Sequence, residues 1–375
     1  MPFPPLAANA VALLDLLREP AHAATLSARE WDLLVRSART ARLLGVLEVR
    51  LTAAGVLPLL PLPVREHLAA AGRVAAYRRR MALYAVDRIA AILVPAGIPL
   101  VLLKGTAYAA QGAACADGRV FEDVDLMIPR PRLAEAEARL LAAGWAYDET
   151  LSPYDDRYYR EWSHELPPLR NAEHPLELDL HHAILPPTGR AQPVSDALFA
   201  DALPIAGSGL LALAPVDQVL HVCAQVFQDS DCVGRLRDLV DLDALLRTHG
   251  GEAGFWPALA RRADRHGLAR ALWYGLRYCS SWLGTPAPAN ATAAVLHAAP
   301  GRATARVMDA LLLRALIPGD PDREPGVGAR IAGVFLAARA VWLRMPPWLF
   351  LYHAVHKGYR AMAGGVRPKS GISSR

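Results

Sequence analysis

The sequence predicts an α/β (α+β) fold, in which a core with a small mixed sheet is flanked by N-terminal and C-terminal all-helical regions. The chain has 375 residues, of which 53% are apolar and 21% are charged. This is enough to bury a core in about two domains, and it excludes disorder across the whole chain. Short apolar runs between Gly and Pro occur in the middle of the chain, whereas apolar residues at helical spacing dominate both ends.

The cysteines and the first residues indicate where the protein works. Four cysteines form no C-x-x-C pair, which argues against a zinc ribbon or a disulfide framework. The first 20 residues have no basic leader and carry Asp15 inside an apolar stretch, so they predict an amphipathic helix and no secretion signal. We therefore expect a cytoplasmic protein.

The first elements of the core follow a helical region over residues 1–90. Its last helix is expected at about 74–93, and the apolar run 98–103 after it predicts a buried strand. Lys104-Gly105-Thr106 then predicts a turn that leads into a short helix at 107–111.

Alternation over residues 121–128 predicts a second strand, and two prolines after it open a helix over 132–143. Segments 158–166 and 176–182 flank a turn-rich stretch and predict the two strands of a hairpin. The middle of the chain is therefore α/β.

Helical spacing returns from Pro215 onward, over 219–227, 235–247 and 255–284. The stretch 318–328, PGDPDREPGVG, predicts a linker because it is rich in Gly and Pro. These patterns divide the chain into an N-terminal helical region, an α/β core, a helical domain, and a linker with a basic apolar helical tail, at residues 1–70, 71–190, 191–317 and 318–375.

The basic excess of the chain lies in its C-terminal part. Residues 325–375 contain eight basic and no acidic residues, interleaved with aromatic side chains. A packed helical pair with an arginine-rich solvent face is the favoured interpretation, and contact with RNA, another anionic acceptor or a membrane surface is the less favoured one. Arg339 and Arg344 interrupt the apolar stretch before it reaches the roughly 20 residues that span a bilayer.

Two acidic pairs at strand spacing are the candidate chemical site. Asp123 and Asp125 are two residues apart, so on a strand both point to one face, roughly 7 Å apart. Glu177 and Asp179 repeat the pattern on a second predicted strand. Carboxylates on one face repel each other unless a cation joins them, and hard oxygen ligands suit magnesium. Three carboxylates from neighbouring strands would suit two-metal phosphoryl or nucleotidyl transfer.

The sequence also lacks competing motifs. It contains no G-x-x-x-x-G-K-[ST] loop, no G-x-G-x-x-G after a strand and no H-E-x-x-H. P-loop kinase and Rossmann interpretations therefore lose support.

The ordered set of Lys104-Gly105-Thr106, then Arg119 to Asp125 (RVFEDVD), then Leu-Asp179-Leu-His181 resembles an uncharacterised bacterial nucleotidyltransferase family of the polymerase-beta-like superfamily. The resemblance covers residues 70–185 well and extends more loosely to residues 219–241. It implies that 71–190 form a nucleotidyltransferase catalytic core.

The resemblance also implies roles for single residues. Asp123 and Asp125 would hold Mg²⁺, in a pair of ions, and Asp179 would complete the metal site and help to activate the acceptor hydroxyl. Gly105 and Thr106 would approach the triphosphate. The remaining candidates are Lys104 and Arg119, for phosphate contact or for holding the acids by charge pairing, and His181, for contact with metal, phosphate or acceptor or for a structural hydrogen bond at the site edge. Glu177 competes with Asp179, since the sequence does not fix the strand register.

These inferences predict an Mg²⁺-dependent, ATP-binding type of enzyme that moves a nucleoside monophosphate from an NTP to a hydroxyl of an acceptor and releases pyrophosphate. The acceptor is a small molecule, a peptide or protein, or an RNA, and the sequence does not choose among them. The alternative is a non-catalytic nucleotide-binding or scaffold protein that keeps the fold.

Overall fold

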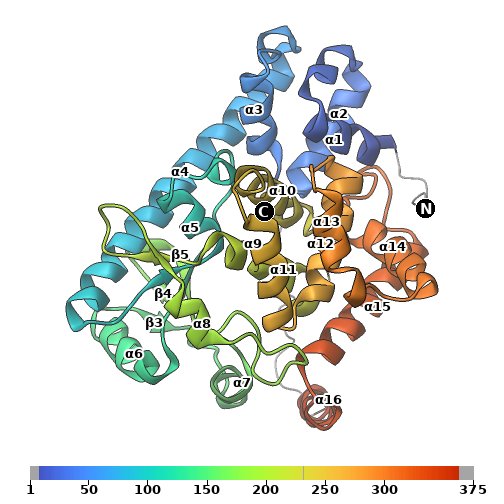
Figure 1. The fold of residues 1–375 in the computed structure, drawn as a ribbon. Helices are drawn as coiled ribbons and strands as arrows, with labels where there is room; N and C mark the ends of the chain where they lie inside the picture. Colours follow the sequence, from blue (N-terminus) through green and yellow to red (C-terminus); the bar gives the residue numbers. More distant parts are fainter. Residues whose placement is uncertain (1–7, 231, 363–375) are drawn as a thin grey trace.

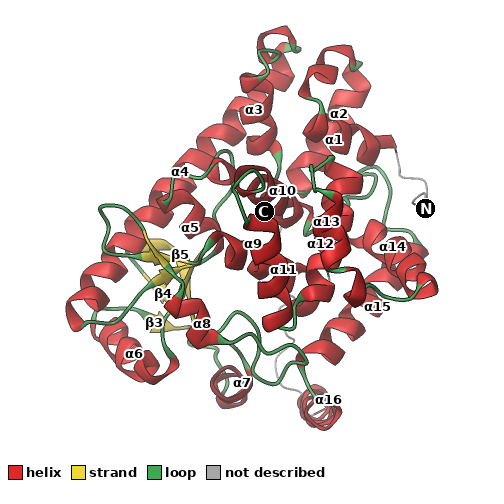
Figure 2. Ribbon diagram, in the orientation of Figure 1, coloured by secondary structure: helices red, strands yellow, loops and turns green. Residues whose placement is uncertain are grey.

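The computed structural model describes residues 8–230 and 232–362 (Figure 1). It is a mixed α+β structure in which helices flank one seven-stranded mixed sheet (Figure 2). The strands are β1 Val101–Leu102, β2 Asp123–Met127, β3 Ala146–Tyr147, β4 Leu169–Asn171, β5 His174–His181, β6 Leu203–Pro204 and β7 Leu211–Ala212. The predicted fold class agrees with this architecture.

The centre of the sheet is formed by β5, β2 and β1, within the order β3-β4-β5-β2-β1-β7-β6. β2 runs parallel to β5 and antiparallel to β1. In the β2–β5 pair, Asp123 lies opposite Glu177 and Asp125 opposite Asp179. The alternate residues Val124, Leu126, Leu176, Leu178 and Leu180 are all buried, so the other face of both strands packs in the core.

Helices α1 Ala8–Arg18, α2 Ala28–Thr40, α3 Leu44–Ala53 and α4 Leu62–Leu93 make up the N-terminal part. A capping box starts α2, because Ser27 and Glu30 each accept a hydrogen bond from the other's backbone N–H. The predicted helix at 74–93 is the second half of α4, which has 32 residues and reaches β5 and α6 Leu133–Ala142. The division predicted at residue 70 falls inside this helix.

Two predicted strands differ from the structure. The run 98–103 forms a ladder only at Val101 and Leu102, after Gly97 with φ 67° ends the preceding 3-10 turn. Residues 158–166 are not a strand: they belong largely to helix α7, Pro153–Trp162. Ser152 caps this helix by accepting from the Asp155 N–H, and Pro153 occupies its first turn. The hairpin partner of β5 is therefore β4.

The helical half after the sheet contains α8 Ser195–Ala200, α9 Pro215–Ala224, α10 Leu236–His249, α11 Phe255–Arg265, α12 Ala269–Tyr278, α13 Ala289–Ala294 and α14 Arg302–Leu316. The predicted helix 255–284 is divided into α11, α12 and a π-helical turn over Cys279–Leu283. Residues 318–326 carry neither helix nor strand, as expected for the linker.

The basic tail forms α15 Val327–Arg344 and α16 Pro347–Met362. α15 packs on α14 and on the π-helical turn Gln225–Asp229, whereas α16 lies against α7, where the Tyr154 and His356 rings stack 3.6 Å apart. The two tail helices are thus packed as helices, but each packs against another part of the chain. No single helix among residues 8–230 and 232–362 is long and apolar enough to cross a membrane; α15 and Pro347–His356 reach that limit only together, across a 118° bend.

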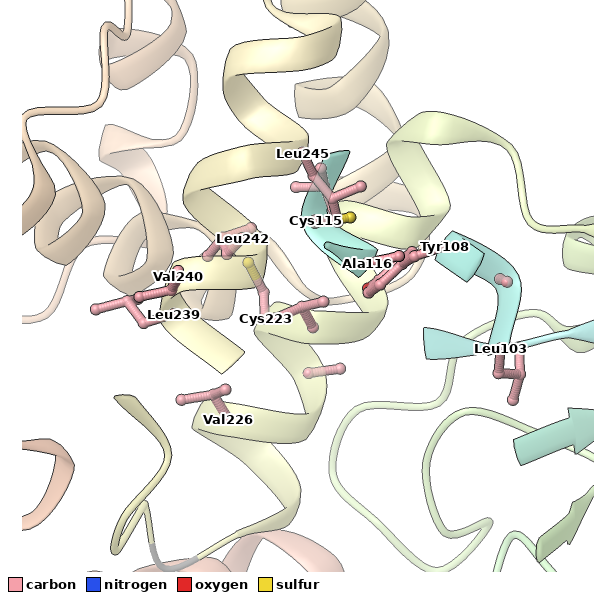
Figure 3. Close-up of a cluster of buried hydrophobic side chains, with 14 of the residues drawn as sticks. Leu103, Tyr108, Cys115, Ala116, Cys223, Val226, Leu239, Val240, Leu242 and Leu245 are labelled. Carbon is pink, nitrogen blue, oxygen red and sulfur yellow. The ribbon is translucent and has the colours of Figure 1, made fainter. Parts of the chain in front are cut away.

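One continuous cluster of buried hydrophobic side chains connects the sheet with the helical half. Figure 3 shows part of it, where Tyr108 of α5 (Lys104–Ala110) and Cys115 face Cys223 of α9 and Leu245 of α10. This contact fixes α5 between β2 and the helices that follow. The four-region division of the chain stays a prediction.

We expect Gly45→Ala to lower the free energy of unfolding by about 1–3 kcal/mol, because a Cβ at this position would lie 2.3 Å from the Gly118 carbonyl oxygen. Gly251→Ala is the matched control, since nothing lies within 4 Å of its added Cβ. Denaturant unfolding of both variants measures the difference. Equal midpoints would contradict close packing of α3 on the loop before β2.

Candidate functional site

Three carboxylates meet on the polar face of the β2–β5 pair. One ligand oxygen from each of Asp123, Asp125 and Asp179 lies within 4.8 Å of the other two. Asp125 is buried, and the other two side chains are partly exposed. Parallel in-register pairing produces this cluster, because it places residues with the same strand parity side by side.

The structure distinguishes the two acids of β5. Asp179 lies opposite Asp125 and joins the cluster. Glu177 lies two residues earlier on β5 and forms an ion pair with Arg170, in which Arg170 Nη2 is 2.5 Å from Glu177 Oε1. Glu177 is therefore neutralised by its neighbour on β4 and lies outside the cluster.

Lys104 and His181 both reach Asp125. Lys104 Nζ donates to Asp125 Oδ1 at 2.5 Å, and His181 Nε2 lies 3.0 Å from the same oxygen. Burial disfavours the charged carboxylate, but Lys104 and His181 outweigh it and hold the pKa of Asp125 well below its usual range. In this structure Lys104 thus holds the acidic cluster by charge pairing, one of the two roles considered from the sequence.

Asp123 and Asp179 have no such partner. Within residues 8–230 and 232–362, no basic side chain lies at ion-pairing distance from either. The negative charge of Asp125, together with burial, raises the pKa of Asp123. Burial, then Glu165, Asp125 and Asp123, raise the pKa of Asp179 well above its usual value. Ionising all three carboxylates is therefore unfavourable without a further positive charge, and this favours binding of a cation with oxygen ligands.

Gly105 and Thr106 lie in the first turn of α5 and are buried. A Cβ on Gly105 would lie 2.2 Å from Nη1 of Arg119, so this glycine allows the Arg119 side chain to pass. Thr106 Oγ1 lies 2.8 Å from the Leu103 carbonyl oxygen and 3.1 Å from that of Asp125. These contacts anchor α5 to β2, and the expected contact of Gly105 and Thr106 with the triphosphate stays a prediction.

Arg119 is also placed differently from the phosphate-contact prediction. Its side chain is 6% exposed, and Nε donates to Asp241 Oδ2 of α10 at 2.9 Å. The guanidinium lies over the Phe121 ring, 5.4 Å from its centroid. Arg119 acts by charge pairing, but its partner belongs to the helical half and not to the acidic cluster.

Four further polar residues surround the cluster and were not selected from the sequence. His164 and Glu165 lie beside His181, and His221 and Asp229 approach from α9 and the π-helical turn after it. Burial raises the pKa of Asp229 to about 6 and, together with His181, keeps the pKa of His164 well below its usual value. The sequence pattern predicts one strand over residues 158–166. It therefore does not reveal the turn after α7 that brings His164 and Glu165 to β5.

A cavity of about 650 Å³ begins next to the cluster. Glu177, two residues along β5 from Asp179, contributes to its wall, and so does Tyr159 of α7. The opposite wall is made by α15 and α16, through residues such as Arg344, Phe350 and His353. The C-terminal tail therefore contributes to the wall of this cavity, and Glu177 in the same wall lies roughly 7 Å along β5 from Asp179.

The fold and the site define a protein with an α+β core and a triad of acids suited to divalent cations. The chain belongs to the uncharacterised nucleotidyltransferase family, whose model matches residues 27–284. No curated protein and no solved structure matches the chain. Membership of the family indicates nucleotidyl transfer from a nucleoside triphosphate in general terms.

The region that the family model matches ends at the boundary of a structural element. It includes the three acids, Lys104 and the Arg119–Asp241 pair, and it ends directly after the π-helical turn Cys279–Leu283. α15 and α16 lie beyond it, so the wall that they give to the cavity is not part of the matched region.

We expect Asp179→Asn to raise the free energy of unfolding of the metal-free protein by about 0.5–2 kcal/mol, because the amide removes repulsion among buried carboxylates. The folded-state pKa of Asp179 is raised, so its destabilising effect grows as the pH rises above the ordinary carboxyl pKa of about 3.9 and is lost as the pH falls below it. The gain should be larger at about pH 8 than at about pH 4. Thermal unfolding in chelator measures it, and a destabilised variant at the higher pH would contradict the repulsion.

Arg119→Met should lower the free energy of unfolding by about 3–5 kcal/mol, since it leaves the Asp241 carboxylate buried and unpaired. Combining it with Asp241→Leu should recover much of the loss. NTP affinity per folded molecule should change little in the double variant, because neither side chain belongs to the three carboxylates of the cluster. A large loss of NTP affinity without loss of stability would restore the phosphate-contact role.

Proposed function

We propose that this protein is an Mg²⁺-dependent enzyme that transfers a nucleoside monophosphate from an NTP to an acceptor hydroxyl, with release of pyrophosphate. The meeting of the Asp123, Asp125 and Asp179 carboxylates within 4.8 Å carries this proposal. Membership of the nucleotidyltransferase family supports it.

The donor set fits magnesium. Three carboxylates offer hard oxygen ligands, and two of them have no basic partner in the part of the chain that the structure describes. Asp123, Asp125 and Asp179 would hold the ions, which we expect as a pair. Bound Mg²⁺ would stabilise negative charge on the triphosphate and on the attacking oxygen.

Asp179 and Lys104 have different roles in the proposed reaction. The acceptor oxygen forms a bond to the α-phosphorus, while the bond from this phosphorus to the bridging oxygen of the leaving pyrophosphate breaks. Asp179, at the side of the cluster nearest the cavity, accepts the hydroxyl proton. Lys104 is a positioning residue, because its ammonium holds Asp125 Oδ1 on the cluster side of β2.

The cavity beside the cluster is proposed as the acceptor site. Its wall combines the rings of Tyr154, Tyr158 and Tyr159 with charged side chains, among them Arg170, which pairs with both Glu177 and Asp148. It thus offers aromatic surface, hydroxyl groups and charges of both signs. The acceptor stays open among small molecules, peptides or proteins and RNA.

The test is incubation of the full chain with each α-labelled NTP, Mg²⁺ and pools of candidate acceptors. Asp123→Asn and Asp179→Asn should each reduce label transfer at least about 100-fold, because each removes a metal ligand. Glu122→Gln is the matched control, as it changes the exposed carboxylate next to Asp123, which pairs with Arg42 outside the cluster and the cavity wall, and it should retain most of the transfer.

Two results would contradict the proposal. Label transfer that survives both aspartate substitutions would move the reaction away from these acids. Mg²⁺-dependent NTP binding with no transfer to any pool would instead favour the non-catalytic nucleotide-binding alternative.

A further inference from the structure

A second group of metal-type donors lies beside the acids and is not used by the proposed reaction. It consists of His164, Glu165 and His181, each of which offers one ligand atom within 4.8 Å of the other two. His181 is buried, and the side chains of His164 and Glu165 are 12% and 22% exposed. Unlike the first cluster, this group contains two imidazoles.

The backbone fixes these three residues together. Glu165 and His181 form an antiparallel bridge, and the Leu166 N–H donates to the Leu180 carbonyl at 3.0 Å. The His182 N–H donates to the His164 carbonyl at 2.8 Å. The segment after α7 is therefore tied to the end of β5, the strand that also carries Asp179.

The distances between donor atoms match those of a coordination sphere. Glu165 Oε2 lies 3.4 Å from His181 Nε2 and 3.9 Å from His164 Nε2. In a four-coordinate site with bonds of about 2.0–2.1 Å, neighbouring ligand atoms are roughly 3.3 Å apart. The Glu165–His181 distance matches this value, the Glu165–His164 distance exceeds it by about half an ångström, and a ligand atom of His164 lies within 4.8 Å of one of His181.

His164 also lacks a partner of its own. Its Nδ1 is buried without a hydrogen bond, and its Nε2 has only the 3.9 Å contact with Glu165 among the described residues. Polar side chains that are this well covered normally have a hydrogen-bond partner. A cation at Nε2, beside Glu165, would give this imidazole a polar partner, while Nδ1 would stay without one.

The surrounding charge favours a further cation. Glu165 and the three aspartates outnumber Lys104, the lysine that pairs with Asp125. His181 Nε2 lies 3.0 Å from Asp125 Oδ1, so Asp125 is within reach as a fourth ligand shared with the acidic cluster. Imidazole nitrogens suit transition-metal ions such as Zn²⁺ and Fe²⁺, whereas Mg²⁺ prefers oxygen ligands.

We propose that His164, Glu165 and His181 form a binding site for a divalent transition-metal ion, connected to the candidate magnesium site through Asp125. Such an ion would hold the segment after α7 against β5 and fix the orientation of Asp125. His164, Glu165 and His181 lie outside the acidic triad, so their binding of a metal ion can be tested without nucleotide transfer.

The experiment is a titration of the tag-free full chain, cleared of metals with chelator, with Co²⁺ followed by visible absorption. We expect one equivalent to bind and to give the d–d bands of a nitrogen-ligated, four-coordinate ion. His164→Asn and Glu165→Gln should each weaken Co²⁺ binding at least about tenfold. Two variants are used so that one that fails to fold does not decide the result.

Asp179→Asn separates this site from the acidic triad. It should lose the thermal stabilisation by Mg²⁺ and keep the Co²⁺ bands, whereas His164→Asn should show the reverse. Failure of the wild-type chain to bind Co²⁺ would overturn the site, and so would unchanged binding in folded His164→Asn or loss of the bands in Asp179→Asn. None of these readouts requires nucleotide transfer, so the proposed function is tested separately.

Discussion

The in-register parallel pairing of β2 with β5 is the constraint on which the candidate site depends. A shift of one residue would turn Asp179 into the core and bring Leu178 or Leu180 beside Asp125. Burial of the alternate leucines prevents this shift, because it would expose the apolar face of β5. The hydrophobic core thus holds three mutually repelling carboxylates close together.

Lys104 and His181 offset only part of the repulsion among the three carboxylates, and they act mainly on Asp125. Lys104 and His181 both reach Asp125, so this acid stays ionised, while Asp123 and Asp179 carry pKa values raised by burial and by their neighbours. Carboxyl groups with raised pKa values lower the stability of the fold, and groups of this kind cluster at functional sites. The arrangement is typical of a site that is completed by a cation.

The helical half contributes directly to the placement of this cluster. α10 supplies Asp241 to Arg119, Gly105 makes room for the Arg119 side chain, and Thr106 ties α5 to the backbone of Asp125. Gly105, Thr106 and Arg119, which the sequence predicted as possible phosphate contacts, therefore connect the sheet to the helices. The tail helices α15 and α16 add a wall to the cavity next to the acids, beyond the part of the chain that the family model matches.

The sequence alone determined the α+β class, the D-x-D strand and a second strand with two candidates for the third acid, because strand alternation and apolar spacing are local properties of the chain. It did not determine the choice between Glu177 and Asp179, which depends on the register between two strands distant in sequence. It also misassigned residues 158–166, whose aromatic residues suit a strand although Ser152 and Pro153 start a helix. Only the tertiary structure decided the partners of Lys104 and Arg119 and the meeting of His164 with His181. Contacts between residues far apart in the chain decide such pairs, and no local pattern encodes them.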